Sequence, residues 1–291
     1  MTNSSPKISI VTPSYNSDLY IEDCIQSVLD QNYPNFEHVI IDGGSTDKTI
    51  SILQKYSHLK WISEPDKGQS DALNKGFQMA TGDIVGWLNA DDFYQPNIFT
   101  CISRTFAEHL NVDIIYGNWN FVNGKRRLIK RFQTVPFNQK AIIYYGPFIG
   151  STALFFKKEI VEEKILLDVR FKYAMDWEWY ARLGKLNKRF LFVNQTFANF
   201  RLHGKNQSHK FKQMTDMDRH FTRSRQLAEA YAIKRCYGHC WGNGRVNIFE
   251  EASYRFLWWY YKTIISLKKA YYILISEPVS LIKYINQRNK Y

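Results

Sequence analysis

Two adjacent carboxylates, Asp91 and Asp92, follow a short apolar run at residues 84–88. A carboxylate at the exit of a buried strand loses hydration, so leaving it unpaired is costly. A divalent cation with oxygen ligands is a suitable partner, and Mg²⁺ typically joins one or two carboxylates to substrate phosphates. The pair therefore predicts a metal–diphosphate site.

The elements around this pair alternate between two kinds of apolar pattern. Short apolar runs that predict strands lie at 8–11, 39–41, 61–62, 84–88 and 114–116. Between them, apolar residues recur at helical spacing, for example at positions 21, 25, 28 and 29. This alternation predicts βαβ units and a mostly parallel sheet. Ligands bind at the carboxyl ends of such strands, so Thr12, Asp42 and Asp91 should line one crevice.

Two common nucleotide-binding motifs are missing from the chain. No G-x-G-x-x-G follows the first strand, and no G-x-x-x-x-G-K-[ST] loop occurs, which argues against a Rossmann dinucleotide site and a P-loop ATPase. A nucleotide would then be held by acidic and hydroxyl side chains. A carboxylate such as Asp42 would suit the N3–H donor of uracil.

Four segments, in this order, resemble the inverting glycosyltransferases of family 2. They read IVTPSYN, IIDGGSTD, EPDKGQSDALNKG and ATGDIVGWLNADD, and the resemblance covers residues 7 to about 210. It implies an α/β fold of GT-A type, with a mostly parallel central sheet flanked by helices and a C-terminal helical extension. The expected catalytic domain is 1–215, with a donor half at 1–110 and an acceptor half at 111–215, followed by a basic, aromatic region at 216–291.

The resemblance also implies a UDP-sugar donor and a divalent cation, Mn²⁺ or Mg²⁺. The residues that it puts near the base and ribose are Thr12, Asp42, Asp66 and Asp71. The family's D-x-D pattern falls on Asn89 and Asp91, so Asp91 would bind the metal with support from Asp92. The chain departs from the family at Asn89, where an acid is common, and at Gly43, which replaces the second acid of the Asp-Asp-Gly turn.

An inverting transfer also needs a base about 3 Å from the attacking hydroxyl, on the far side from the metal. The resemblance assigns this role to Asp176, and Met175 replaces the usual preceding Glu. Glu178 is the alternative base. In a further alternative, Asp176 is only a carboxylate at a helix start beside core aromatic residues.

Arg201-Leu202-His203 resembles an R-x-H segment that follows the last strand of the family's fold. It implies that His203 reaches the metal or the diphosphate, although an ordinary polar histidine has the same sequence. Lys67 could likewise contact the diphosphate or be a solvated surface lysine.

The net charge of +12 is unevenly distributed. Residues 1–110 carry 7 Lys and Arg against 14 Asp and Glu, whereas residues 111–291 carry 32 against 13. Within 254–291 the polar positions form a stripe at helical spacing among aromatic and aliphatic residues, which favours contact with an anionic membrane or packing against protein. No apolar run reaches the roughly 20 residues of a spanning helix.

The resemblance implies a hexosyl- or N-acetylhexosaminyl-transferase that acts on a glycan or lipid-linked glycan in surface polysaccharide or lipopolysaccharide synthesis. With no secretory signal, we expect a cytoplasmic protein, peripheral on the inner face of the membrane. A sugar-nucleotide hydrolase or nucleotidyltransferase using the same site is the alternative. A nucleic-acid-binding protein is disfavoured because no such module is recognisable. Zinc at the CYGHC segment is disfavoured because a second cysteine pair is missing. Self-association stays open.

Overall fold

The computed structural model describes residues 5–203, 229–230, 232–233 and 236–237 of the 291-residue chain. Its strands are β1 (Ile8–Ser14), β2 (Phe36–Asp42), β3 (Leu59–Ser63), β4 (Ile84–Trp87), β5 (Phe93–Tyr94), β6 (Ile114–Asn123), β7 (Leu128–Phe132), β8 (Leu154–Lys157) and β9 (Phe190–Leu202). Its α-helices are α1 (Ile21–Leu29), α2 (Thr49–Leu53), α3 (Gln69–Met79), α4 (Ile98–Glu108), α5 (Gln139–Tyr145), α6 (Glu159–Glu162) and α7 (Met175–Lys185). A 3₁₀ turn, η1, spans Ser151–Ala153.

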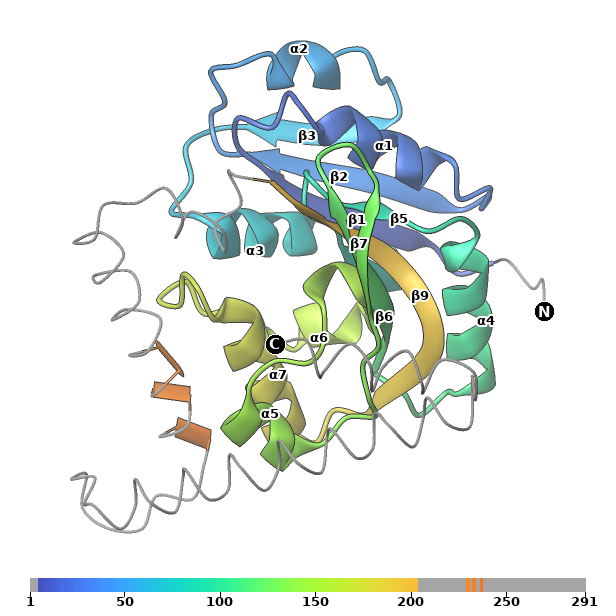
Figure 1. Cartoon of the computed structure of the whole chain (residues 1–291), viewed down its shortest axis with the longest axis vertical. Coiled ribbons are helices and arrows are strands. Elements are labelled where there is room, and N and C mark those ends of the chain that lie inside the picture. Colours follow the sequence, from blue (N-terminus) through green and yellow to red (C-terminus); the bar gives the residue numbers. More distant parts are fainter. Residues whose placement is uncertain (1–4, 204–228, 231, 234–235, 238–291) are drawn as a thin grey trace.

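These strands form one sheet in the order β3-β2-β1-β4-β8-β6-β9-β5, and β7 pairs with β6 (Figure 1). The four strands from β3 to β4 run parallel. Beyond them the sheet is mixed, because β8 is antiparallel to both β4 and β6 while β9 is parallel to β6. The parallel part therefore brings the carboxyl ends of β1, β2, β3 and β4 to one edge.

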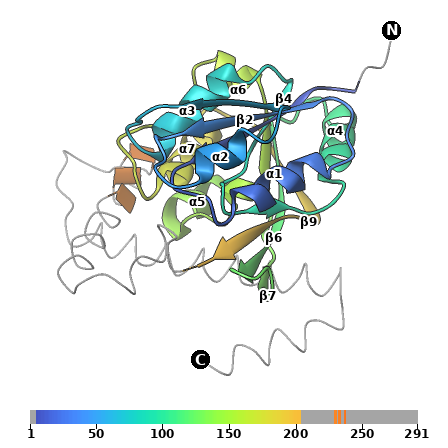
Figure 2. The same cartoon turned by 90° about the horizontal axis from the view of Figure 1, so that it is seen from above.

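The period-two alternation of the strands divides the core between the two faces of the sheet. Val11, Val39 and Val85 pack in one cluster with residues of α3 and α7. Ile8 and Ile10 pack in another cluster, with residues of α1 and α4. In both views α1 and α2 lie on one side of β1 and β2, and α3 lies on the other (Figure 1, Figure 2).

The packing of α3 on the sheet depends on a glycine. A Cβ atom on Gly76 would lie 2.3 Å from Cγ1 of Val11 and 3.2 Å from Cγ1 of Ile41. Because no real side-chain atom tolerates so short a contact, a larger residue would push α3 away from β1. The helix begins after Gly68, whose φ of 114° is a backbone conformation that glycine adopts readily.

The structure confirms the expected α/β fold of GT-A type, and every strand predicted from the first 120 residues is present. The helix that follows β2 is α2. It begins at Thr49, and Oδ1 of Asp47 accepts the Thr49 N–H at 2.9 Å.

Much of the predicted C-terminal region, 216–291, lies outside the described residues. Its described residues are helical, and Ile233 is fully buried in the same core cluster as α3 and α7. The boundary at 215 stays a prediction. Within the described part of the chain, helices are too short or too polar to cross a membrane.

Candidate active site

The ends of three parallel strands form the first wall of the site. Ser14, Asp42 and Ser63 lie side by side in the register of β1, β2 and β3. Oδ2 of Asp42 accepts hydrogen bonds from the Ser63 hydroxyl at 2.8 Å and from the N–H groups of Gly44 and Ser45 at 3.1 and 2.8 Å. Asp42 is fully buried, so in this state its carboxylate organises the turn after β2.

Thr12 lies within β1 rather than after it, and its side chain is fully buried. Its hydroxyl is 2.9 Å from Nε2 of His38 on the neighbouring strand. Burial lowers the pKa of His38 to about 3, so that imidazole is neutral. Contact between the Thr12 hydroxyl and the base of a UDP-sugar stays a prediction. The burial of the Thr12 side chain does not favour it.

Tyr15, which the sequence reasoning did not single out, is exposed at the end of β1. Its ring lies beside Gly43, since a Cβ there would be 3.5 Å from Cδ2 of Tyr15. The same Cβ would lie 2.6 Å from Oδ2 of Asp66. The missing second acid of the turn is therefore explained locally: Gly43 leaves the space that Asp66 occupies. An exposed aromatic residue directly after a buried strand was the available signal for Tyr15.

The other two residues predicted to bind the donor lie in the turn before α3, which holds Asp66, and in the first turn of that helix, which holds Asp71. Oδ1 of Asp66 accepts the N–H of Gly68 at 2.7 Å, and Oδ2 of Asp71 accepts the N–H of Lys67 at 3.1 Å. Asp71 also lies 3.6 Å from the ammonium group of Lys75. The carboxylates thus shape an acidic turn, and Lys67 is exposed on it.

Asn89 shows why an amide replaces the expected acid. Its Oδ1 accepts hydrogen bonds from Nε2 of Gln69 at 2.9 Å and from Nε1 of Trp87 at 2.8 Å. Its Nδ2 donates to Oδ2 of Asp92 at 3.0 Å. A carboxylate could not make the last contact, because it has no proton to donate when ionised.

Asp92 points into the protein. It is fully buried, and its Oδ1 accepts the N–H of Arg201 at 2.8 Å. Burial, together with the charge of Asp91, raises the pKa of Asp92 well above its ordinary value. Asp92 therefore supports the turn from behind, and Asp91 is the carboxylate of the pair that reaches the surface.

Arg201 fixes this turn in place. The side chain is almost fully buried, and Nε donates to the carbonyl oxygen of Asp91 at 2.8 Å. The guanidinium also donates to Oδ2 of Asp23 at 2.6 Å and to the carbonyl of Gly124 at 3.0 Å. The sequence reasoning named Arg201 only as part of the R-x-H segment, and the structure identifies it as the residue that holds Asp91.

His203 lies opposite Asp91. Its Nε2 is 2.9 Å from Oδ2 of Asp91, and its ring packs on Tyr20 with centroids 4.6 Å apart. The described residues include no cluster of three or more His, Cys, Asp or Glu side chains that could hold a metal alone. Asp91 could supply a carboxylate oxygen to a cation of the Mg²⁺ or Mn²⁺ type, which takes its further ligands from substrate phosphates and water, and His203 lies beside that carboxylate.

Asp176 is the second residue of α7. Its Oδ1 accepts the N–H of Trp177 at 2.8 Å, and burial raises the pKa of Asp176 to about 6. Glu178 is buried and bonded to Arg182 through both oxygens, at 2.8 and 3.0 Å. Because that ion pair occupies its carboxylate, Glu178 is not available as the alternative base.

The donor side and α7 meet at the start of α3. Gln69 contacts Asn89, as described above, and the hydroxyl of the next residue, Ser70, lies 2.9 Å from Sδ of Met175 and 3.3 Å from the carbonyl of Phe171. Residues from β4, α3 and α7 are therefore contiguous. The structure brings the region of Asp176 to the same end of the sheet as Asn89, although 87 positions separate them in the sequence.

An α/β sheet of this GT-A architecture, with acidic residues at its strand ends, is typical of one class of glycosyltransferases. The family model described as Glycosyl transferase family 2 matches residues 9–169. The chain belongs to this family.

Curated relatives include enzymes of bacterial polysaccharide synthesis. The chain is 27% identical to chondroitin synthase from Escherichia coli over 239 residues, which is 79% of this chain and 34% of that enzyme. It is 44% identical over 103 residues to a Bacillus subtilis glycosyltransferase named for teichuronic acid biosynthesis, covering 33% of this chain and 40% of the relative. The chain thus spans well under half the length of these two relatives.

Solved structures share the fold. TarS residues 1–349 from S. aureus, in complex with UDP-GlcNAc, aligns with a TM-score of 0.59 and 19% identity over 89% of this chain and 81% of that one. A mannosyltransferase from Pyrobaculum calidifontis, in complex with GDP-Man and Mn²⁺, aligns with a TM-score of 0.55 and 16% identity over 96% of this chain and 88% of that one. At this identity the likeness concerns the fold alone.

Proposed function

We propose that this glycosyltransferase moves one hexosyl or N-acetylhexosaminyl group, with inversion, from a UDP-sugar to a glycan or lipid-linked glycan in surface polysaccharide or lipopolysaccharide synthesis. The observation that carries the proposal is the position of Asp176. It lies in the first turn of α7, at the end of the sheet where the turn after β4 carries Asn89 and Asp91. Its raised pKa, about 6, suits a base that must be ionised near neutral pH.

The donor would lie across the ends of β1, β2 and β4. The exposed ring of Tyr15 offers a stacking surface for a uracil base, and Asp66 lies beside it. The Asp42 carboxylate would hold the turn under the base. Asp91 and His203 would hold Mn²⁺ or Mg²⁺ under the diphosphate, where a cation stabilises the negative charge of the leaving group.

In the proposed transfer, the acceptor hydroxyl attacks the anomeric carbon from the face opposite the diphosphate. A bond forms between the acceptor oxygen and the anomeric carbon, and the bond from that carbon to the phosphate oxygen breaks. The hydroxyl proton passes to the carboxylate of Asp176, and the electron pair of the broken bond leaves with UDP. Attack from the opposite face inverts the anomeric configuration.

The test is product analysis by mass spectrometry with a panel of UDP-sugars, Mn²⁺ and glycan acceptors. Asp176→Asn should bind UDP normally while turnover falls about 10²- to 10⁴-fold, the usual contribution of a general base. Asp91→Ala should lose metal-dependent UDP binding. Sugar attached to an acceptor supports transfer, whereas release of free sugar alone would make the enzyme a hydrolase. Full activity of Asp176→Asn would remove that residue from the mechanism.

Contact with an anionic membrane through 254–291 belongs to the same proposal. The basic and aromatic composition of that segment supports it, although the segment lies outside the described residues. Flotation with anionic liposomes should retain the full chain and lose the variant in which Lys262 and Lys269 are replaced by Glu. Charge reversal in the full chain is the suitable design, because truncation at 215 would also remove Ile233 from the core. Equal flotation of the two proteins would refute membrane contact.

A further inference from the structure

A residue far along the chain contacts the backbone just before α7. Oε1 of Glu229 accepts the N–H of Lys172 at 3.0 Å, and Oε2 accepts the N–H groups of Tyr173 and Ala174, each at 2.9 Å. These contacts span 55 to 57 sequence positions. One carboxylate thus binds three consecutive backbone donors.

This contact lies beside a helix start that has no side-chain cap of its own. The first N–H groups of a helix have no partner within the helix, and the residue at the N-cap position usually supplies one from its side chain. The N-cap of α7 is Ala174, which has no such side chain. Glu229 binds the N–H groups that lead into the helix, and its negative charge lies at the positive end of the helix dipole.

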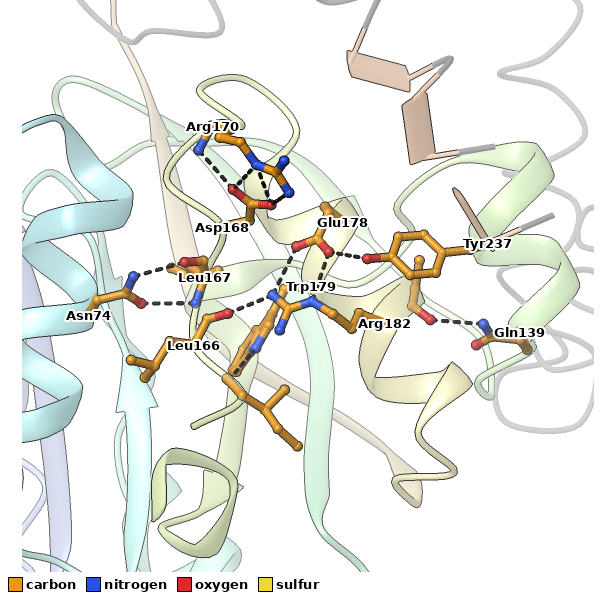
Figure 3. A network of polar contacts seen from close by, with 12 residues as sticks. Asn74, Gln139, Leu166, Leu167, Asp168, Arg170, Glu178, Trp179, Arg182 and Tyr237 are labelled. Carbon is orange, nitrogen blue, oxygen red and sulfur yellow. Dashed lines mark hydrogen bonds and ion pairs between the residues drawn. The ribbon is translucent and has the colours of Figure 1, made fainter. Parts of the chain in front are cut away.

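The same segment holds α7 at two further points. Ile233 is fully buried in the cluster that contains Trp179, and the hydroxyl of Tyr237 donates a hydrogen bond to Glu178 (Figure 3). Glu178 is in turn paired with Arg182, whose NH2 group donates to the carbonyl of Leu166 at 2.6 Å. These network residues gather around the middle of α7 in Figure 3.

The spacing of the three contacts fits one face of a helix. Glu229, Ile233 and Tyr237 are four residues apart, and the described residues around them are helical. They lie outside residues 9–169, which the family model matches. The contact is therefore a feature of this chain that the family's four N-terminal motifs do not contain.

We propose that Glu229 is a positioning residue for Asp176: it fixes the backbone at 172–174 and thereby the start of α7, two residues before the base. This inference rests on the proposed function, because it takes Asp176 as the base. The other described contacts of this turn include the Ser70 hydroxyl on the carbonyl of Phe171 and the N–H of Phe171 on the carbonyl of Asp168 at 3.1 Å, and Phe171 and Ala174 also pack against the core. A general base misplaced by about 1 Å can lose about 10²-fold in rate.

The test compares full-length Glu229→Gln with wild type and with the control Glu163→Gln, which removes a half-exposed carboxylate paired with Lys188. A glutamine keeps one acceptor oxygen and turns an NH₂ group towards backbone donors. In Glu229→Gln, amide hydrogen exchange at residues 172–174 should accelerate at least tenfold. The affinity for UDP with Mn²⁺ should stay within twofold of wild type, while kcat falls about 10- to 100-fold. Glu163→Gln should change none of these.

Two further variants separate positioning from a general loss of structure. Glu229→Asp keeps both carboxylate oxygens on a shorter chain and should recover part of the lost kcat. In an Asp176→Asn background, Glu229→Gln should cause little additional loss, because residues that act as one unit are not additive. A full additional loss in that background would overturn the proposal, and so would unchanged amide exchange or unchanged kcat in Glu229→Gln.

The outcomes also distinguish this inference from the proposed function. If Asp176→Asn is fully active, the proposed base is wrong whatever the Glu229 variants do. If Asp176→Asn is impaired and Glu229→Gln turns over like wild type, the base stands and the positioning role fails.

Discussion

Nε2 of His203 lies 2.9 Å from Oδ2 of Asp91, a residue 112 positions earlier in the chain. The imidazole comes from just beyond β9 and the carboxylate from the turn after β4. Arg201, two residues before His203, holds the carbonyl of Asp91 at 2.8 Å. The end of β9 therefore positions both the carboxylate and its partner.

Replacing His203 should lower the affinity for Mn²⁺ more than it lowers the stability of the fold. With an imidazole ligand lost, we expect His203→Ala to need about 10- to 100-fold more Mn²⁺, on the scale seen when groups around a metal site are removed. Titration of Mn²⁺ in the presence of UDP, followed by calorimetry, measures this directly. His109→Ala removes an exposed histidine at the end of α4 and serves as control. An unchanged Mn²⁺ titration would exclude His203 as a ligand.

Asp176 should reduce stability at neutral pH. Its pKa in the folded protein is about 6, above its ordinary value. The folded state therefore keeps its proton where the unfolded state has lost it, and stability falls as pH rises from about 4 to 6. Asp176→Asn should raise Tm at pH 8 and change it little at pH 4.

The same carboxylate predicts the pH dependence of turnover. Because the base acts only when ionised, kcat of the wild type should fall as pH drops below about 6. Initial rates between pH 5 and 8, with UDP binding checked at each pH, measure this limb. A kcat that does not change between pH 5 and 8 would contradict the raised pKa of Asp176. The raised pKa would also be contradicted if Asp176→Asn raised Tm by the same amount at pH 4 as at pH 8.

Asn89→Asp should destabilise the protein rather than improve the site. It places a carboxylate against Oδ2 of Asp92 and removes the hydrogen bond of 3.0 Å from Nδ2. We expect a loss of about 1–3 kcal/mol, the cost of a buried polar group that loses its partner. The loss should grow with pH, because ionising both carboxylates is unfavourable. Denaturant unfolding at pH 5 and 8 tests this, with the exposed Asn187→Asp as control. If Asn89→Asp loses the same free energy of unfolding relative to wild type at both pH values, this reading of Asn89 is refuted.

Gly43→Ala should act through Asp66. A Cβ at position 43 would lie 2.6 Å from Oδ2 of Asp66, which is the movable end of a side chain. The fold should therefore change little, while UDP affinity falls about tenfold, the equivalent of one lost hydrogen bond. Asp66→Ala should weaken binding similarly, and the double variant should be no worse than either single one. Additive losses would show that Gly43 acts through another group.

The parallel half of the sheet could be predicted from the sequence because its determinants are local. The apolar runs at 8–11, 39–41 and 84–88 alternate with helical spacing, and each of them forms a strand. The meeting of strand ends followed from the geometry of parallel sheets. The insertion of β8 between β4 and β6 had no comparable signal, because antiparallel insertion depends on long-range pairing.

The site can be divided in the same way, into what the sequence indicated and what only the folded structure showed. The resemblance of the sequence to the family pointed to positions 91, 176 and 203 and to the departures at 43 and 89. Only the tertiary structure decided which way the side chains point: Asp92 and Thr12 into the protein, and Asp91 towards His203. It also decided that Glu178 is held in an ion pair and that Glu229 contacts the start of α7. The reason is physical. A sequence determines which groups can ionise, donate or pack, whereas burial and the partners that close a contact across more than fifty residues exist only once the chain has folded.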